Sequence, residues 1–310
     1  MAKVMQATKR RATESESGYS LIELMVAVTV LMIVSATVMD GVLRLSRVSG
    51  SVSNRSEMHS GIRNATELLT QEVGQAGRVS LPGVVTLTGG AAPGVQTIGV
   101  SSADGMFVGE NLVIDAGAVR ETVTLTAVDL VGDTITADFA NAHAAGAPVT
   151  VHGGFADGIV PTTNANGSTG TLLKLFGDVN DDGNMVYVEY WCDTVGGNLY
   201  RNMMDFDAGA KPAVTVAEVL LNNIMPNPGG DPCFTYQEVT VSGTTFVIDV
   251  AITLTVQTAR ADPITGAFQT ETKALLNVSP RNVYYVWQLA SGAVTNRVQP
   301  MPASVAALLP

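Results

Sequence analysis

One long apolar segment near the N-terminus constrains this chain more than any other feature. From Leu24 to Met39 no side chain is charged, and with Tyr19 to Glu23 the apolar run reaches 21 residues with one carboxylate. An α-helix needs about 20 residues to cross the hydrocarbon core of a bilayer, so this segment is long enough to span a membrane. A secretory signal has a shorter apolar core that ends at small residues. No such site follows here, so we expect the helix to continue.

The charges around this segment are distributed unevenly. The first 18 residues carry Lys3, Lys9, Arg10 and Arg11 with two glutamates, a net charge of +2, and their removal would change the net charge of the chain from −11 to −13. A basic head, an apolar run and an acidic body are typical of an exported protein. The acidic body would repel a phosphate backbone, so we expect no nucleic-acid partner.

Two residues are unusual for a plain membrane anchor. Glu23 places a carboxylate inside the apolar run. A charge in hydrocarbon costs about 3 kcal/mol, so an intramembrane carboxylate indicates a functional role. Gly18 separates the polar leader from the run and offers a backbone without a side chain, which a protease can hold extended.

Residues 18–27, GYSLIELMVA, closely resemble the class III signal of type IV pilins and pseudopilins. In that family a Gly, an aromatic residue and then T/S-L-I-E precede an apolar helix. The resemblance implies that a membrane-embedded prepilin peptidase cleaves after Gly18, that the new N-terminus at Tyr19 is methylated, and that Glu23 acts in assembly. Tyr19 replaces the commoner Phe and keeps the aromatic character.

Cleavage would create an α-amine at Tyr19, four residues before Glu23. A carboxylate inside an apolar filament core needs a cationic partner. The amine of a neighbouring subunit would set the axial register of subunits, whereas the amine of the same chain would neutralise Glu23 locally. The sequence leaves both interpretations open.

The helix is predicted to run from about Tyr19 to about Gly77. Its second half carries an amphipathic stripe for packing against a sheet. The stripe consists of Met58, Ile62, Ala65, Leu69, Val73 and Ala76. The predicted fold is α+β, with this pilin helix on an antiparallel β-sheet head. The predicted divisions are a leader (1–18), the helix (19–80), a β-rich insertion (81–155) and the head with a C-terminal tail (156–310).

The β-rich body shows short Val, Thr and Ile runs separated by Gly, Asp and Asn, such as residues 121–128 and 134–139. Residues 153–170 are rich in Gly, Asn and Thr and are predicted to form a linker or long loop. Residues 171–285 resemble PilW-like minor pilins, through a V-x-Y strand followed by L-Y-R and a closing S-P-R-N-V, which J-type pseudopilins share.

An acidic segment between two predicted strands fits a calcium-loop pattern. Its candidate ligands are Asp178, Asn180, Asp182, Asn184 and Glu189. Side-chain oxygens two residues apart can turn towards one ion, and Gly183 permits the sharp turn. Asp, Asn and Gly also favour tight turns, and residues 185–191 alternate as a strand. Calcium binding and a plain acidic turn therefore both stand, with the turn favoured.

The two cysteines, Cys192 and Cys233, form an even pair in a chain with the features of export. That compartment favours a disulfide, and two buried free thiols are the alternative. His143 and His152 lack the spacing of metal ligands, so we expect structural roles for them.

The sequence contains no nucleophile elbow, zinc-protease motif, P-loop or dinucleotide fingerprint, and we expect no enzymatic activity. The resemblance implies a PilW-like minor type IV pilin that primes assembly at or near the pilus tip. Its partners would be other minor and major pilins, the prepilin peptidase and the inner-membrane assembly platform. The precursor would cross the inner membrane once, with its head in the periplasm, before entering the filament. The alternatives are a J-like pseudopilin of a type II secretion system and a membrane-anchored adhesin-like β protein.

Overall fold

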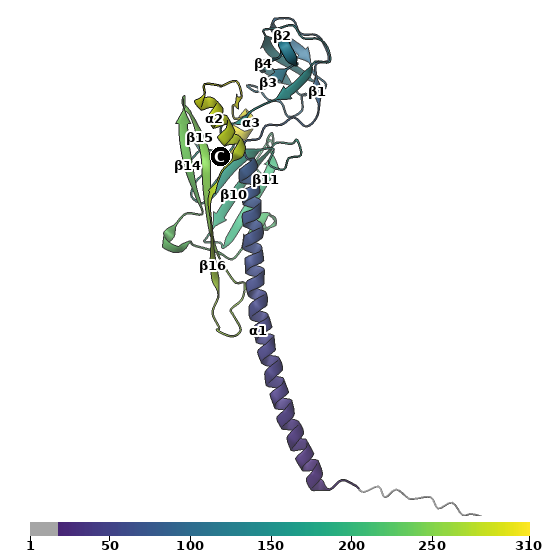
Figure 1. Cartoon of the computed structure of the whole chain (residues 1–310), viewed down its shortest axis with the longest axis vertical. Coiled ribbons are helices and arrows are strands. Elements are labelled where there is room, and N and C mark those ends of the chain that lie inside the picture. Colours follow the sequence, from purple (N-terminus) through teal and green to yellow (C-terminus); the bar gives the residue numbers. More distant parts are fainter. Residues whose placement is uncertain (1–17) are drawn as a thin grey trace, which may run out of the picture.

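The computed structural model describes residues 18–310, apart from the side chain of Leu276. A long helix, α1 (Leu21–Gln75), leads into a β-sheet head, and a small β module lies beyond the C-terminal end of α1 (Figure 1). The predicted α+β class, with a long N-terminal helix and mostly antiparallel sheets, is confirmed. Residues 1–17 of the predicted leader lie outside the described residues.

The ends of α1 follow from local chemistry. At the start, Ser20 is the N-cap: its hydroxyl accepts the N–H of Ile22, and the carboxylate of Glu23 accepts the N–H of Ser20 at 3.1 Å. This reciprocal pair is a capping box, which satisfies N–H groups that have no partner in the first turn. At the other end, Gly77 has φ of 79°, and a Cβ there would lie 2.8 Å from Val283 Cγ2. Glycine therefore allows the chain to leave the helix against the head.

The head contains two antiparallel sheets. The first has the order β12-β11-β10-β9, and in the second β15 pairs with β16 on one side and with β13 and β14 on the other. The strands of the first are β9 (Leu172–Gly177), β10 (Val186–Asp193), β11 (Asn198–Asp205) and β12 (Val219–Asn222). Those of the second are β13 (Ile224–Met225), β14 (Phe234–Val241), β15 (Thr244–Gln257) and β16 (Thr270–Val278). Short 3₁₀ turns, η2 (Val216–Glu218) and η3 (Pro228–Gly230), lie in the connections.

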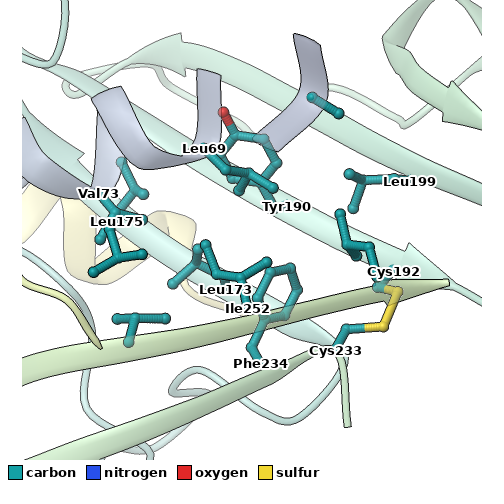
Figure 2. Close-up of a cluster of buried hydrophobic side chains, with 14 of the residues drawn as sticks. Leu69, Val73, Leu173, Leu175, Tyr190, Cys192, Leu199, Cys233, Phe234 and Ile252 are labelled. Carbon is teal, nitrogen blue, oxygen red and sulfur yellow. A yellow bond between two sulfur atoms is a disulfide. The ribbon is translucent and has the colours of Figure 1, made fainter. Parts of the chain in front are cut away.

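The head core forms where α1 crosses both sheets. Figure 2 shows Leu69 and Val73 of α1 above Leu173 and Leu175 of β9, with Ile252 of the second sheet beneath them. All six residues of the predicted stripe are buried, from Met58 at 8% exposed to Leu69 at 0%. The stripe therefore packs as its spacing predicts.

The module between α1 and the head has two small sheets, in the orders β1-β7-β3-β4 and β2-β6-β5. Its strands are β1 (Val85–Thr86), β2 (Gly94–Gly99), β3 (Asn111–Ile114), β4 (Glu121–Thr124), β5 (Ala127–Asp129), β6 (Thr134–Phe139) and β7 (Pro148–Val151), with η1 (Gly117–Val119) before β4. The run at 121–128 is divided between two strands, β4 and β5. The chain changes sheets at Leu125 and Thr126, whose N–H groups donate to Glu110 and Thr136 respectively.

The C-terminal part returns to the base of the module. β17 (Val298–Gln299) pairs in parallel with β8 (Gly154–Phe155), so the segment predicted as a linker or loop holds a short strand. Two helices, α2 (Arg281–Ser291) and α3 (Ala303–Leu308), complete the head. Gln299 is fully buried, and its amide donates to the carbonyl oxygen of Asn111 at 2.9 Å. These contacts join the module to the end of the chain.

Candidate functional site

Among the described residues, the first half of α1 has no neighbour except the loop between β15 and β16, whose Ile264 lies beside residues 40–48. Residues 21–49, which we call the bare half, are all exposed, whereas residues 58–75, the packed half, carry the buried stripe from Met58 to Val73. Among residues 18–310, α1 is the one helix long and apolar enough to cross a membrane. The apolar run at residues 19–39 exposes apolar side chains around the whole helix, so it has the form of a membrane span.

The predicted processing residues lie directly before this helix. Tyr19 is 91% exposed, and a Cβ added at Gly18 would meet no atom within 4 Å. The bond between them is therefore accessible. Glu23 lies in the first helical turn and contacts Ser20 through the capping box. Among the described residues no Lys, Arg or His forms an ion pair with Glu23, so its carboxylate has no cationic partner within this part of the chain.

Four of the five predicted calcium ligands lie in the turn between β9 and β10, and the fifth, Glu189, lies in β10. Asp178 is fully buried, and its carboxylate accepts the N–H groups of Asp182 and Gly183 at 3.1 and 3.2 Å. Arg78 lies 3.6 Å from the same carboxylate and also pairs with Asp181. These bonds build the turn between β9 and β10. The residues fit the acidic-turn interpretation, in which Asp178 has backbone and Arg partners in place of an ion.

Glu189 faces a different environment from the rest of that set. Its carboxylate accepts the hydroxyl of Tyr187 at 2.6 Å and pairs with Lys211 at 2.6 Å and Lys174 at 3.5 Å. As a member of β10, it lies on a face of the sheet and not in the turn. Within residues 18–310, no three His, Cys, Asp or Glu side chains are grouped to hold a metal ion. Glu189 therefore has partners other than the residues of the turn, and calcium binding stays a prediction beside the acidic turn that the sequence favours.

The two cysteines are joined. A disulfide links Cys192, in β10, with Cys233, directly before β14, across Cα atoms 6.5 Å apart (Figure 2). Both cysteines are buried, and the bond connects the first sheet to the second at one end of the core.

A buried ion pair between α1 and the head was not predicted. Glu72 is 1% exposed, and Arg201 Nε donates to its carboxylate at 3.0 Å, while the Tyr190 hydroxyl donates to the same group. Burial, together with the Glu72 carboxylate, raises the pKa of Tyr190, which stays a neutral donor. Glu72 lies three residues after Leu69 and four before Ala76, so the spacing of the stripe could have placed it on the buried face.

A second buried network lies in the module. His143 Nε2 is 2.6 Å from Glu121, and Nδ1 is 3.1 Å from Asp115. Burial opposes a charge on the ring, but the two carboxylates outweigh it and raise the pKa of His143. The three residues lie far apart in the chain, and no local pattern predicts their meeting. The network is a structural ion cluster that joins β4 to the loops at Asp115 and His143.

Comparison with known families bears on the N-terminus. Residues 15–39 match the family model described as the prokaryotic N-terminal methylation motif. No curated protein matches the chain. The matched segment contains Gly18, Tyr19, Glu23 and most of the apolar run, and it continues into the single helix α1. The chain therefore carries a type IV pilin-like N-terminus on a long apolar helix, as in a membrane-anchored precursor.

Proposed function

We propose that the chain is a minor type IV pilin of the PilW-like kind, processed by a prepilin peptidase and inserted into a filament through α1. The observation that carries the proposal is the methylation motif, which leads without interruption into the bare half. A helix that is apolar on all sides needs cover on all sides. Lipid would cover it in the precursor, and the helices of neighbouring subunits would cover it in the filament.

Processing would prepare Glu23 for assembly. Hydrolysis of the bond between Gly18 and Tyr19 releases the basic leader and leaves an α-amine on Tyr19, to which a methyl group is added. The capping box occupies the Glu23 carboxylate with a neutral N–H, which does not compensate its charge. A charge moved into an apolar core is stabilised by an opposite charge. The α-amine of an adjacent subunit is the partner that the proposal assigns, and this pairing would fix the axial register.

The shape of the far end supports a position at or near the tip. The β1–β7 module lies beyond the C-terminal end of α1 (Figure 1), so a subunit stacked above along the helix axis would meet the module. A terminal position avoids that collision. The proposed role is to prime assembly, and it involves no catalysis by this chain.

The first test is the intact mass of the membrane-extracted protein, with and without a co-expressed prepilin peptidase. The proposal expects a peptidase-dependent loss of residues 1–18 and the gain of one methyl group. An unprocessed chain, or cleavage after the apolar run, would refute it. Cross-linking to neighbouring subunits then distinguishes a pilus from a type II secretion filament.

The second test separates processing from assembly. Glu23→Ala should still lose its leader but fail to enter filaments, because the carboxylate that pairs with the neighbouring amine is gone. Asp40→Ala is the matched control, since Asp40 is an exposed carboxylate on the same helix and its partner, Arg44, lies within the chain at 2.8 Å. Normal incorporation of Glu23→Ala would show that the helix assembles without this charge pair.

A further inference from the structure

The loop between β15 and β16, residues 258–269, extends from the head along α1 towards its N-terminus (Figure 1). Ile264, near the tip of this loop, lines a groove with residues 40–48 of α1. The other lining residues are Asp40, Leu43, Arg44, Arg47 and Val48. The loop therefore reaches the bare half of α1, where the apolar run ends.

The loop is held against α1 by specific contacts. Asp262 is buried and accepts the hydroxyl of Ser51 at 2.6 Å and the N–H groups of Ile264 and Thr265 at 2.7 and 3.1 Å. A Cβ added at Gly50 would lie 3.3 Å from Pro263 Cγ, so the loop touches the helix backbone there. The height of Ile264 along α1 is thus fixed by the fold.

That height corresponds to the surface of a bilayer. A hydrocarbon core of about 30 Å takes about 20 helical residues, so a span that begins at Leu21 ends near Asp40. The headgroup layer adds about 5–7 Å on each side, which is the rise of about four residues, to Arg44. Ile264, in contact with the groove at residues 40–48, lies at or just above this layer.

The chemistry of the loop and of the adjoining helix suits that position. Ile264 and Phe268 are 59% and 54% exposed, and both are large apolar side chains on a loop. Arg44 and Arg47 are exposed beside Ile264 in the groove, and Arg260 is exposed on the loop itself. Asp40 and Arg44 form an ion pair in which their charges offset each other, Arg47 and Arg260 form no ion pair among the described residues, and Asp262 is buried in the loop. The surface is therefore apolar and basic in a chain whose net charge is −11.

We propose that residues 258–269, with Arg44 and Arg47, dock on the anionic phospholipid headgroups of the membrane that α1 spans, before the subunit enters a filament. Ile264 and Phe268 insert at the interface, while the arginines bind phosphate groups. A basic residue beside an anionic leaflet contributes about 1 kcal/mol. The contact fixes the orientation of the head on the membrane. The inference rests on the proposed insertion of α1.

The test uses the full chain in vesicles of phosphatidylcholine and phosphatidylglycerol. A bimane fluorophore is attached at Ile264→Cys, at Val131→Cys on the module as the distant control, or at Val30→Cys within the apolar run. The native cysteines are bonded to each other, so each variant has one reactive thiol. Lipid with a nitroxide on the headgroup should quench position 264 several-fold more than the exposed position 131. Lipid with a nitroxide in the acyl chain should quench position 30.

The outcomes separate the inference from the proposed function. If acyl-chain nitroxide quenches position 30 but headgroup nitroxide quenches position 264 no more than position 131, the docking is overturned and membrane insertion stands. No quenching at 30 would overturn both. Fluorescence at 264 that responds to protein concentration, and not to headgroup nitroxide, would show that a second copy covers the loop and would also overturn the docking.

A charge-removal variant tests the lipid chemistry. With the label at 264, Arg47→Gln with Arg260→Gln should lower the quenching severalfold in vesicles that contain phosphatidylglycerol. It should have little effect in phosphatidylcholine alone. Equal quenching in both lipids, unchanged by the variant, would overturn the assignment of anionic headgroups.

Discussion

The two halves of α1 belong to one continuous helix but are stabilised by different surroundings. Leu31 in the bare half is 64% exposed, whereas Leu69 in the packed half is fully buried against the head sheets. As far as Met39, and apart from Glu23, the bare half is uncharged on every side, as a lipid-facing or filament-core helix requires, and the packed half is apolar along one stripe. Continuity of a helix therefore does not imply a single environment. The transition falls at residues 49–56, which are rich in serine and contact the 258–269 loop.

The largest difference between the two halves is expected when the same substitution is made in each. Leu69→Ala should lower the free energy of unfolding of the head by about 2–5 kcal/mol, because it removes a buried side chain and leaves a cavity. Leu31→Ala should leave that free energy unchanged, since Leu31 contacts no part of the head. Urea unfolding of the full chain in detergent measures both. Equal losses would show that the bare half also supports the head.

A smaller effect is expected from the buried ion pair. Glu72→Gln keeps the size of the side chain but leaves Arg201 without its negatively charged partner. It should lower the free energy of unfolding by about 2–3 kcal/mol, since Arg201 retains some contact with solvent. Glu67→Gln is the matched control on the same helix, because Glu67 pairs with Arg63 at the exposed surface and such pairs contribute little. If Glu67→Gln lowered the free energy of unfolding as much as Glu72→Gln, the burial of the Glu72–Arg201 pair would not explain the loss.

The smallest effect is expected in the β1–β7 module, from the buried network of His143, Glu121 and Asp115, to which α1 contributes no residue. The pKa of His143 is raised in the folded chain, so its stabilisation is fully present below its ordinary value of 6.5 and is lost as pH rises through the higher folded value. The melting temperature should therefore fall by a few degrees from mildly acid to alkaline pH. His143→Gln should flatten this dependence. A slope unchanged by the substitution would assign it to other groups.

Local signals predicted the helix and its N-terminal motif well. The predicted helix, Tyr19 to Gly77, differs from the observed Leu21–Gln75 by two residues at each end, because the apolar run, the stripe and the glycines are all local in sequence. The stripe also predicted the face that packs on the sheets. Glu72 was missed because a charged residue is usually exposed, although its spacing placed it beside Leu69.

Features that depend on contacts between residues far apart in the chain could not be predicted from the sequence. The change of sheet at Leu125 depends on a hydrogen bond to Glu110, which no pattern within 121–128 reveals. Glu189 matched the calcium-loop spacing but follows the alternation of β10, which directs it to Lys174 and Lys211. A strand register overrides a loop motif when the motif extends into the strand.

The disulfide between Cys192 and Cys233 has a mechanical consequence. A subunit held by its N-terminal helix transmits tension through α1 to the head, and α1 lies across both sheets. Without a covalent link, a pull could separate the sheets and release the helix from one of them. The bond closes a segment of 41 residues and fastens the two sheets at one end. Tension on the helix therefore acts on both sheets together. We expect the packed half to detach from the two sheets in one step and not from each sheet in turn.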